Sequence, residues 1–367
     1  MKPDQIPTCP FEISLYSDNK CRAINMVTGL VYSEKYLEHN LGPGHPERPE
    51  RLEAIVKALK AANYWGDHRT KIIDPSPATP EKIELVHDRE HVELIKRLSS
   101  SGRALDLDTP THTNTFNLAL LAAGGTIKAG EEVVEGRLAN AFALIRPPGH
   151  HASRAKGGGF CYFNNIAIMS EVLKREKDIG KIFILDFDAH HGNGTQDIFY
   201  EDPSVLYMSL HQDGRTLYPG TGFVEEIGVG EGEGYNVNIP LPPGSSDEDY
   251  AGVMRELFVP LTEAFKPDLI AVSAGFDAYA RDPLTQLQLS TKAYGWLARY
   301  VVEQTEKLCG GRTVFVLEGG YDLDAVAGSV VQIVKVLTGE RPEFPAKFRT
   351  PDVVKESKQL LANYWKL

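Results

Sequence analysis

Five short apolar segments, most of them separated by room for a helix, constrain the fold of this 367-residue chain more than any other feature. Each segment is apolar along its whole length instead of alternating between apolar and polar residues. This pattern is typical of a parallel strand that helices cover on both faces. The segments are residues 141–145, 181–186, 205–210, 269–273 and 313–317.

Helical patterns precede and separate these segments, with apolar residues recurring at spacings of three and four. They cover residues 49–62, 115–135, 165–177, 247–264, 291–308 and 322–337. Strands that alternate with helices predict the α/β class, here a three-layer α/β/α domain with a mainly parallel central sheet. Because no low-complexity run or internal repeat marks a linker, we expect one domain over residues 1–367.

The composition narrows the class of protein. With 42% hydrophobic and 24% charged residues, the chain has the proportions of a globular protein and not of a disordered one. Its formal net charge of -11 argues against a nucleic-acid partner and favours a cationic substrate. The N-terminus lacks the apolar core of a signal peptide and no apolar run reaches the ~18 residues of a membrane span, so we expect a cytoplasmic protein.

The four cysteines are scattered through the chain without a CxxC pair, at Cys9, Cys21, Cys161 and Cys309. This spacing argues against both a disulfide framework and a thiolate zinc site. We therefore expect reduced thiols.

Polar residues and glycines directly follow four of the five apolar segments. RPPGHH follows residue 145, FDAHHGNG follows residue 186, AGFDA follows residue 273, and EGGY follows residue 317. Open α/β sheets bind their ligands at the carboxyl ends of the strands. The four motifs therefore predict one site at one edge of the sheet.

Metal-ligating side chains stand out within these motifs. In the segment DFDAH the polar residues occupy every second position, so on an extended backbone Asp186, Asp188 and His190 point to one face. Asp277 comes from the end of another strand. Two carboxylates and an imidazole, with a position left for water, form the open arrangement of a catalytic zinc. The alternative is that the acids cap helices and the histidine belongs to the core.

The tandem pair His150 and His151 has the character of acid–base machinery, because imidazole titrates near neutral pH and two rings can share a proton transfer. Asp186 and Asn193 are candidates to fix the tautomers of the two rings. In EGGY, two glycines permit a loop that brings the phenol of Tyr321 near the metal, where it can donate to an oxyanion.

With these motifs in this order, the chain resembles the zinc-dependent histone deacetylase family, which includes acetylpolyamine amidohydrolases and acetoin-utilisation proteins. The resemblance runs from about residue 45 to about residue 337 and is closest to the class II-like and prokaryotic branch. It rests on RPPGHHA, GGGFCYFNN, LDFDAHHGNGTQ, PGTG, AGFDA and EGGY.

The resemblance implies a reaction and its principal residues. Zinc would be held by Asp188, His190 and Asp277, while His151 matches the general base and Tyr321 the phenol that polarises the substrate carbonyl. The implied reaction is hydrolysis of an N-acyl amide, most simply that of an acetylated lysine side chain.

The residues behind the general base follow the prokaryotic pattern. His150, paired with Asp186, matches the electrostatic partner of His151. Asn193 replaces the aspartate of the nuclear deacetylases. Because an amide carries no charge, His151 should be less basic than with a carboxylate.

The resemblance also implies a substrate tunnel. Phe160, after Gly159, and Tyr218 match its two aromatic walls, although tyrosine replaces the commoner phenylalanine at the second. Asp108 matches a rim aspartate that binds substrate amides, and Arg51 an arginine of the internal cavity through which acetate can leave. The alternatives for Asp108 and Arg51 are a helix cap and a surface ion pair.

Members of the family also hold one or two potassium ions. The first set of matching residues is Asp186, Asp188, His190, Ser209 and Leu210. The second set is Phe199, Asp202, Val205 and Tyr235.

Three other functions stay open from the sequence. An acetylated polyamine is an alternative substrate, although Leu284 stands where polyamine-selective relatives have a glutamate, and an apolar side chain cannot pair with a buried cationic amine. A catalytically silent acyl-amine binding module would keep the pocket without the chemistry. An arginase-like two-metal hydrolase would need further carboxylates. A homo-oligomer is compatible with any of these readings.

Overall fold

One continuous sheet of eight strands runs through the protein, whose computed structural model describes residues 27–367. All neighbouring strands are parallel and lie in the order β2-β1-β3-β8-β7-β4-β5-β6. The α/β prediction is confirmed, and the sheet is wholly parallel instead of mainly so. Its strands are β1 Thr28–Val31, β2 Thr70–Ile73, β3 Asn140–Ala143, β4 Ile182–Asp186, β5 Val205–Gln212, β6 Asn236–Leu241, β7 Leu269–Ala274 and β8 Thr313–Leu317.

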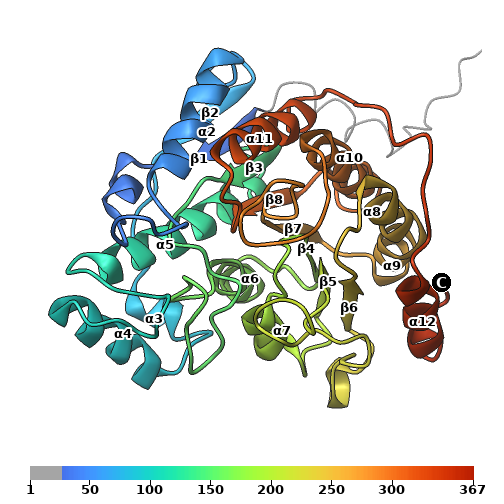
Figure 1. Ribbon diagram of the computed structural model, residues 1–367, viewed down its shortest axis with the longest axis horizontal. Coiled ribbons are helices and arrows are strands. Elements are labelled where there is room, and N and C mark those ends of the chain that lie inside the picture. Colours follow the sequence, from blue (N-terminus) through green and yellow to red (C-terminus); the bar gives the residue numbers. More distant parts are fainter. Residues whose placement is uncertain (1–26) are drawn as a thin grey trace, which may run out of the picture.

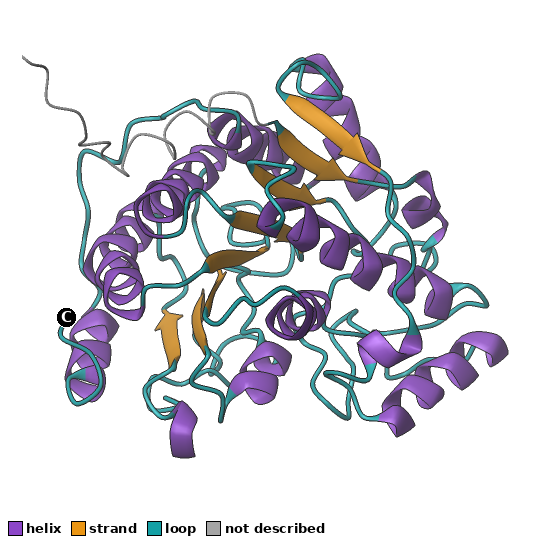
Figure 2. Cartoon of the chain, turned by 180° about the vertical axis from the view of Figure 1, so that it is seen from behind, coloured by secondary structure: helices purple, strands orange, loops and turns teal. Residues whose placement is uncertain are grey.

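Helices cover both faces of this sheet (Figures 1 and 2). One face carries α2 Glu50–Ala61, α10 Thr291–Leu308 and α11 Leu323–Leu337, and α11 contacts both of the other two helices. The other carries α5 Thr115–Val134, α6 Asn165–Glu176 and α7 Asn193–Phe199. These two layers give the three-layer architecture, and all residues of the central strands β3, β4, β7 and β8 are buried between them.

Smaller elements complete the fold. The helix α12, Asp352–Leu361, contacts β6 and so protects the edge of the sheet from pairing with another chain. The remaining short elements are η2 Glu34–Glu38, α3 Pro80–Ile83, α4 Arg89–Ser101 and η3 Gly230–Gly232.

The structure corrects two expectations about single elements. The expected helix over 247–264 is interrupted: a π-helical turn, η4 Met254–Phe258, separates α8 Asp247–Val253 from α9 Val259–Phe265. The sequence pattern also missed three strands, because β1 and β2 are only four residues long and β6 alternates between asparagine and apolar residues. A search for continuous apolar runs does not detect such strands.

Some sequence predictions fall on residues 1–26. The interpretation of the N-terminus, the thiols of Cys9 and Cys21, and the first part of the expected 1–367 domain lie outside the described residues. Cys161 and Cys309 are free, buried thiols, as expected. No helix between residues 27 and 367 combines the length and the apolarity needed to cross a membrane.

Candidate active site and metal centre

Four neighbouring strands carry the polar motifs to one edge of the sheet. In the order β3, β8, β7, β4, their carboxyl ends deliver RPPGHH, EGGY, AGFDA and FDAHHGNG. The motifs lie far apart in the sequence and in a different order there. The parallel topology alone makes them adjacent, as the strand-end argument predicts.

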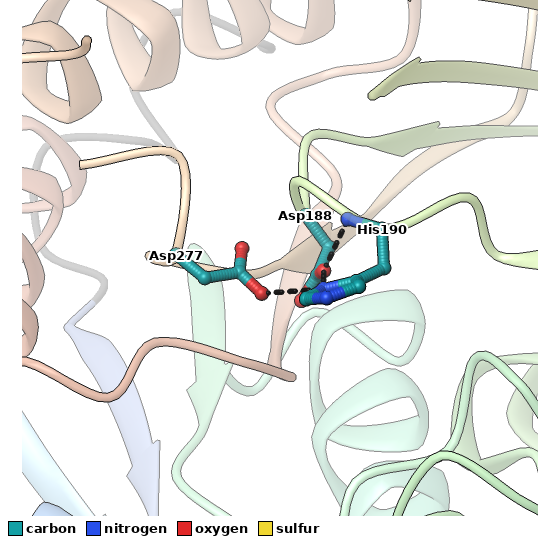
Figure 3. A group of neighbouring side chains, drawn as sticks. All are labelled: Asp188, His190 and Asp277. Atoms are coloured by element: carbon teal, nitrogen blue, oxygen red, sulfur yellow. Dashed lines mark hydrogen bonds and ion pairs between the residues drawn. The ribbon is translucent and has the colours of Figure 1, made fainter. Parts of the chain in front are cut away.

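Three side chains meet at this edge in a buried cluster (Figure 3). Each of Asp188, His190 and Asp277 offers a ligand atom within 4.8 Å of those of the other two. His190 Nδ1 lies 2.9 Å from Asp277 Oδ2 and 3.2 Å from Asp188 Oδ1. Within residues 27–367 no other group of metal-ligating side chains of three or more converges in this way.

The backbone that presents the cluster is not the extended strand that the alternating pattern predicts. Strand β4 ends at Asp186, and residues 188–190 form bends. The carboxylate of Asp186 accepts the N–H of Asp188 at 3.1 Å, and that of Asp188 accepts the N–H of His190 at 2.8 Å. These two successive aspartate turns aim Asp188 and His190 at the site, because a short carboxylate can bond to the backbone two residues on.

The donor set of this cluster fits a divalent metal ion. Burial and the charge of Asp188 raise the pKa of the Asp277 carboxyl to about 6. Burial opposes charging of the His190 ring, but the two carboxylates outweigh it and raise the pKa of His190 to about 10. The two buried carboxylates thus favour a positive charge beside them, and a metal bound by these three side chains would supply it in place of the proton on His190.

Two glycines allow the strand ends to close around Asp188. A Cβ atom at Gly275 would collide with the Asp188 carboxylate, and one at Gly319 would lie 2.6 Å from Asp188 Oδ2. The N–H of Gly319 donates to that same oxygen at 2.8 Å. These positions need glycine because the backbone of two neighbouring strand ends approaches the carboxylate directly.

The tandem histidines lie beside the cluster with their rings 4.1 Å apart. His150 Nδ1 lies 3.1 Å from Asp186 Oδ2, and His151 Nδ1 lies 2.8 Å from Asn193 Oδ1. Both pairs are those expected from the sequence. Tyr207 also donates to the Asp186 carboxylate, at 3.0 Å.

The two rings differ in charge. Burial opposes the charged form of His150, but the carboxylates of Asp188 and Asp186 outweigh it and raise the pKa of His150 to about 10. Burial and the charges of His150 and His190 hold the pKa of His151 well below its ordinary value. A neutral imidazole thus lies next to a cationic one, which is an arrangement typical of separated acid and base roles.

A cavity of about 250 Å³ leads from the surface to these side chains. Tyr218 and Leu284 lie at its mouth, 47% and 38% exposed. Deeper in, the rings of Phe160 and Tyr321 meet edge to face at 5.9 Å. The lining contains the residues expected around the substrate, which are Asp108, Gly159, Phe160, Tyr218, Leu284 and Tyr321. It also contains three residues that the sequence did not assign to the tunnel, which are Pro148, Cys161 and Leu217.

Arg51 lies behind this cavity and is not part of its lining. It is fully buried, so it is not a surface ion pair. Its guanidinium donates to the carbonyl oxygens of Glu318 and Gly320, both at 2.6 Å, and lies 5.1 Å from the ring centroid of Tyr321. Arg51 therefore holds the loop that carries Tyr321. Its expected part in a product channel stays a prediction.

Asp108 lies in an irregular loop at the rim and caps no helix. Burial and the neighbouring Asp106 raise the pKa of its carboxyl above the usual range. The imidazole of His45 lies 3.1 Å from the carbonyl oxygen of Asp108 and contacts the Phe160 ring edge to face at 4.7 Å. His45 thus ties the rim loop to the tunnel wall.

Comparison with known proteins agrees with this site. A profile of the histone deacetylase domain matches residues 45–337. This chain belongs to the histone deacetylase family. A probable deacetylase of Archaeoglobus fulgidus is 43% identical over 359 residues, which cover 93% of this chain and 99% of that protein.

Other relatives support the same assignment. The chloroplastic histone deacetylase 14 of Arabidopsis thaliana is 42% identical over 328 residues, or 85% of this chain and 77% of that protein. The crystal structure of an HDA15 HD domain aligns with a TM-score of 0.87 at 35% identity, covering 92% of this chain and 97% of that chain. The family resemblance is confirmed, and the relatives support deacetylase function, a hydrolysis.

The residues of the first expected potassium set lie around the end of β4. Asp186 pairs in register with Ser209 on β5, next to Leu210. Ser209 Oγ lies 2.8 Å from His211 Nδ1, and His211 Nε2 lies 2.8 Å from the carbonyl oxygen of Gly222. The hydroxyl of Ser209 thus donates to the ring, which leaves its oxygen lone pairs available to a cation.

The residues of the second expected potassium set lie mainly where α7 leads into β5. The N–H of Asp202 donates to the carbonyl of Phe199 at 3.0 Å, and that of Val205 donates to the carbonyl of Asp202 at 3.3 Å. The N–H of Tyr207 donates to the carbonyl of Tyr235 at 2.9 Å. The Asp202 carboxylate is already paired with the Lys174 ammonium at 2.6 Å. A lysine thus neutralises the only charged side chain of this set.

Sequence reasoning missed one buried acid of the site. Glu318 begins EGGY, and its Oε2 accepts the N–H groups of Gly149 and His150 at 2.7 and 3.2 Å. It therefore fixes the turn that carries the tandem histidines. Its position directly after a buried strand was the signal that could have identified it.

Proposed function

We propose that this deacetylase is a zinc-dependent amidohydrolase that removes acetyl groups, or longer acyl groups, from the side-chain amine of N-acyl-lysine in peptides or proteins. The observation that carries the proposal is the convergence of one buried Asp, His, Asp cluster with a tandem histidine and a tyrosine around one narrow cavity. Borderline ligands of this kind, with no thiolate, suit zinc. When bound, zinc supplies Lewis acidity to the acyl carbonyl and lowers the pKa of a water.

His151 is the general base of this proposal. Because Asn193 Oδ1 is an acceptor, the proton of the neutral His151 ring resides on Nδ1. Nε2 then carries the free lone pair, which can take a proton from the attacking water. The low pKa of His151 keeps this nitrogen unprotonated. His150, held cationic by Asp186, stabilises negative charge that develops beside it.

Tyr321 supplies the remaining functional group of the site. Its phenol lines the cavity and its pKa is raised by burial, so it stays protonated. A protonated phenol can donate a hydrogen bond to the oxyanion that forms when water adds to the acyl carbonyl. A protonated histidine then gives its proton to the departing amine. The step balances as one amide and one water giving a carboxylate and an alkylammonium ion.

The shape of the cavity favours a lysine side chain. Phe160, Tyr218 and Leu284 form mainly apolar walls that suit four methylenes and exclude water from the amide. The secondary amine of an acetylpolyamine would leave a positive charge among these walls, none of which offers it a charged partner. Asp108 at the rim would still attract cationic peptides from outside.

A steady-state screen of the zinc-loaded protein tests this proposal. Acetyl-lysine peptides, longer acyl-lysines and N8-acetylspermidine are compared by kcat/KM. The proposal expects the acetyl-lysine peptide to be favoured. A tenfold preference for acetylspermidine would replace it with a polyamine deacetylase. Absence of turnover with every amide, despite full zinc content, would instead indicate a binding module.

Three further expectations belong to this proposal. The single cluster of metal ligands in the described chain favours one catalytic metal over an arginase-like pair. One or two potassium ions are proposed from the family resemblance. The cytoplasm is proposed as the compartment from the sequence, although two relatives carry chloroplastic names. Cell fractionation tests the proposed compartment.

A further inference from the structure

We propose that Asp282 is the positioning residue that sets the place of the Tyr321 phenol in the cavity. Asp282 lies in the loop between β7 and α10 and is only 7% exposed. Its Oδ2 accepts the backbone N–H of Tyr321 at 2.8 Å, and its Oδ1 accepts the N–H of Leu284 at 2.9 Å. This inference rests on the proposed amidohydrolase function.

The need for such an anchor arises from the backbone beside Tyr321. Gly320 has a φ of +113°, and Gly319 and Gly320 together leave this loop with little intrinsic stiffness. Arg51 holds the carbonyl of Gly320, and the N–H of Phe276 donates to the carbonyl of Gly319 at 3.0 Å. The carbonyl of Gly320 and the N–H of Tyr321 belong to one planar peptide unit, so Arg51 holds this unit at its carbonyl and leaves its N–H to be satisfied by another group. Among the described residues, Asp282 provides that contact.

The backbone that carries Asp282 is itself held in place. Its N–H donates to the carbonyl of Tyr279 at 2.9 Å, and two residues earlier the N–H of Ala280 donates across the loop to the carbonyl of Leu289 at 3.0 Å. Asp282 thus belongs to a closed loop that is attached to the start of α10. A rigid anchor on one loop can therefore position a flexible glycine loop on the neighbouring strand end.

The same carboxylate couples two parts of the cavity. Tyr321 acts on the acyl carbonyl, whereas Leu284 forms the wall at the mouth, and each receives one oxygen of Asp282. Only an acid satisfies both N–H groups. An asparagine has one acceptor oxygen, and its NH2 group would face the second backbone N–H.

The test compares Asp282→Asn and Asp282→Ser with the wild type, and repeats both in a Tyr321→Phe background. Asp268→Asn is the matched control, because the Asp268 carboxylate also accepts two backbone N–H groups, from Gly180 and Lys181 at 3.0 and 2.8 Å, far from the site. Measurements are kcat and KM for an acetyl-lysine peptide, zinc content and the thermal unfolding temperature.

We expect both Asp282 variants to bind zinc and to lose about 10- to 100-fold in kcat with KM changed much less, because a displaced catalytic group loses rate and not affinity. In the Tyr321→Phe background the same substitutions should change kcat less than threefold. Asp268→Asn should leave kcat unchanged. A rescue by Asp282→Glu is not expected, since the longer side chain cannot reach both N–H groups from the same backbone.

Several results would overturn the inference. An equal loss of kcat with and without the Tyr321 hydroxyl would show that Asp282 acts through another group. An unchanged kcat would show that the loop carrying Tyr321 keeps its conformation without the Asp282 carboxylate. If neither variant folds, Asp282 stabilises the whole chain and the positioning role is wrong. These outcomes require an active wild type, so they are distinct from failure of the proposed function, in which the wild type itself hydrolyses no acyl-lysine.

Discussion

The ring of Tyr321 contacts the ring of Phe160 and the guanidinium of Arg51, and it lines the cavity from a loop that contains two glycines. Substitution of Tyr321 by phenylalanine removes one oxyanion donor and little volume. We expect kcat to fall by about 100-fold or more with KM nearly unchanged. Steady-state kinetics check this, with Tyr300→Phe on α10 as the control. An unchanged kcat would mean that the hydroxyl does not face the reacting carbonyl.

Under the proposed function, we expect Leu284 to control the selectivity between acetyl-lysine and acetylpolyamine substrates. Leu284→Glu would place a carboxylate at the mouth of the cavity, where it could pair with the secondary ammonium of a polyamine. We expect the ratio of kcat/KM for acetyl-lysine peptide over N8-acetylspermidine to narrow or reverse. Leu284→Gln is the control, because glutamine is polar like glutamate but carries no charge. This variant should leave the ratio within about threefold of the wild type. An equal effect of both variants would contradict the charge argument.

Helix α5 shows how packing can override helix propensity. At Gly124 a Cβ would collide with the carbonyl oxygen of Ser76 and lie 2.5 Å from the backbone nitrogen of Ala78. Gly328 in α11 has no atom closer than 3.8 Å, the Thr291 Cγ2. The two glycines are therefore matched by helical position and differ in the space around them.

Gly124→Ala should lower the free energy of unfolding by about 1 to 3 kcal/mol, because the backbone of the 75–78 segment must move. Gly328→Ala should raise it by up to about 1 kcal/mol, the usual gain of alanine over glycine in a helix. Urea unfolding measures both. A higher free energy of unfolding for Gly124→Ala would show that helix propensity, and not the close approach, dominates at this position.

On the scale of the whole molecule, activity and folding should separate on loss of the metal. The cluster lies at the sheet edge, whereas the core spans both faces of the sheet. Chelation, Asp188→Ala and Asp277→Ala should each abolish turnover while the far-ultraviolet circular dichroism stays unchanged. Zinc should restore the chelated wild type but not the variants. Elemental analysis should find one zinc per chain, and active protein without a transition metal would refute the zinc proposal.

Stability should fall with acid because of buried neutral histidines. The Nε2 atom of His87 accepts the N–H of Asn164 at 2.9 Å, and Nδ1 donates to the carbonyl of Ser153 at 2.8 Å, so a proton on Nε2 would break a buried bond. Burial, and then the charge of His91, lower the pKa of His87 from 6.5 to about 3. Below pH 6.5 the unfolded chain thus binds more protons than the folded one, and this contribution to stability is lost as the pH falls towards 3.

His87→Gln should reduce the slope of unfolding free energy against pH by up to about 1.4 kcal/mol per pH unit between pH 6 and 4. The slope, and not the absolute stability, is the readout, because the substitution also alters packing. His68, whose side chain is 86% exposed, provides the control variant His68→Gln. Equal slopes for wild type and His87→Gln would show that another group governs the acid transition.

Much of the site could be predicted because its chemistry is encoded locally. Asp188, His190 and Asp277 follow buried strands directly, and a parallel sheet brings such positions to one edge. The pairing of the two histidines with Asp186 and Asn193 also followed from the motifs. The strands β1, β2 and β6 could not be predicted in this way, since they are short or alternate in polarity.

The sequence by itself determined the residue types of the centre, the order of the five continuously apolar strands and the helices between them, and the strand ends that carry the motifs. Tertiary structure decided which strand ends become neighbours, how the bends after β4 aim Asp188, and which buried groups hold the Tyr321 loop. Arg51 lies 269 residues from Gly320, and Asp282 lies 39 residues from Tyr321. No local pattern reports such bonds, because they form only when packing of the sheet brings the backbone N–H and C=O groups within reach.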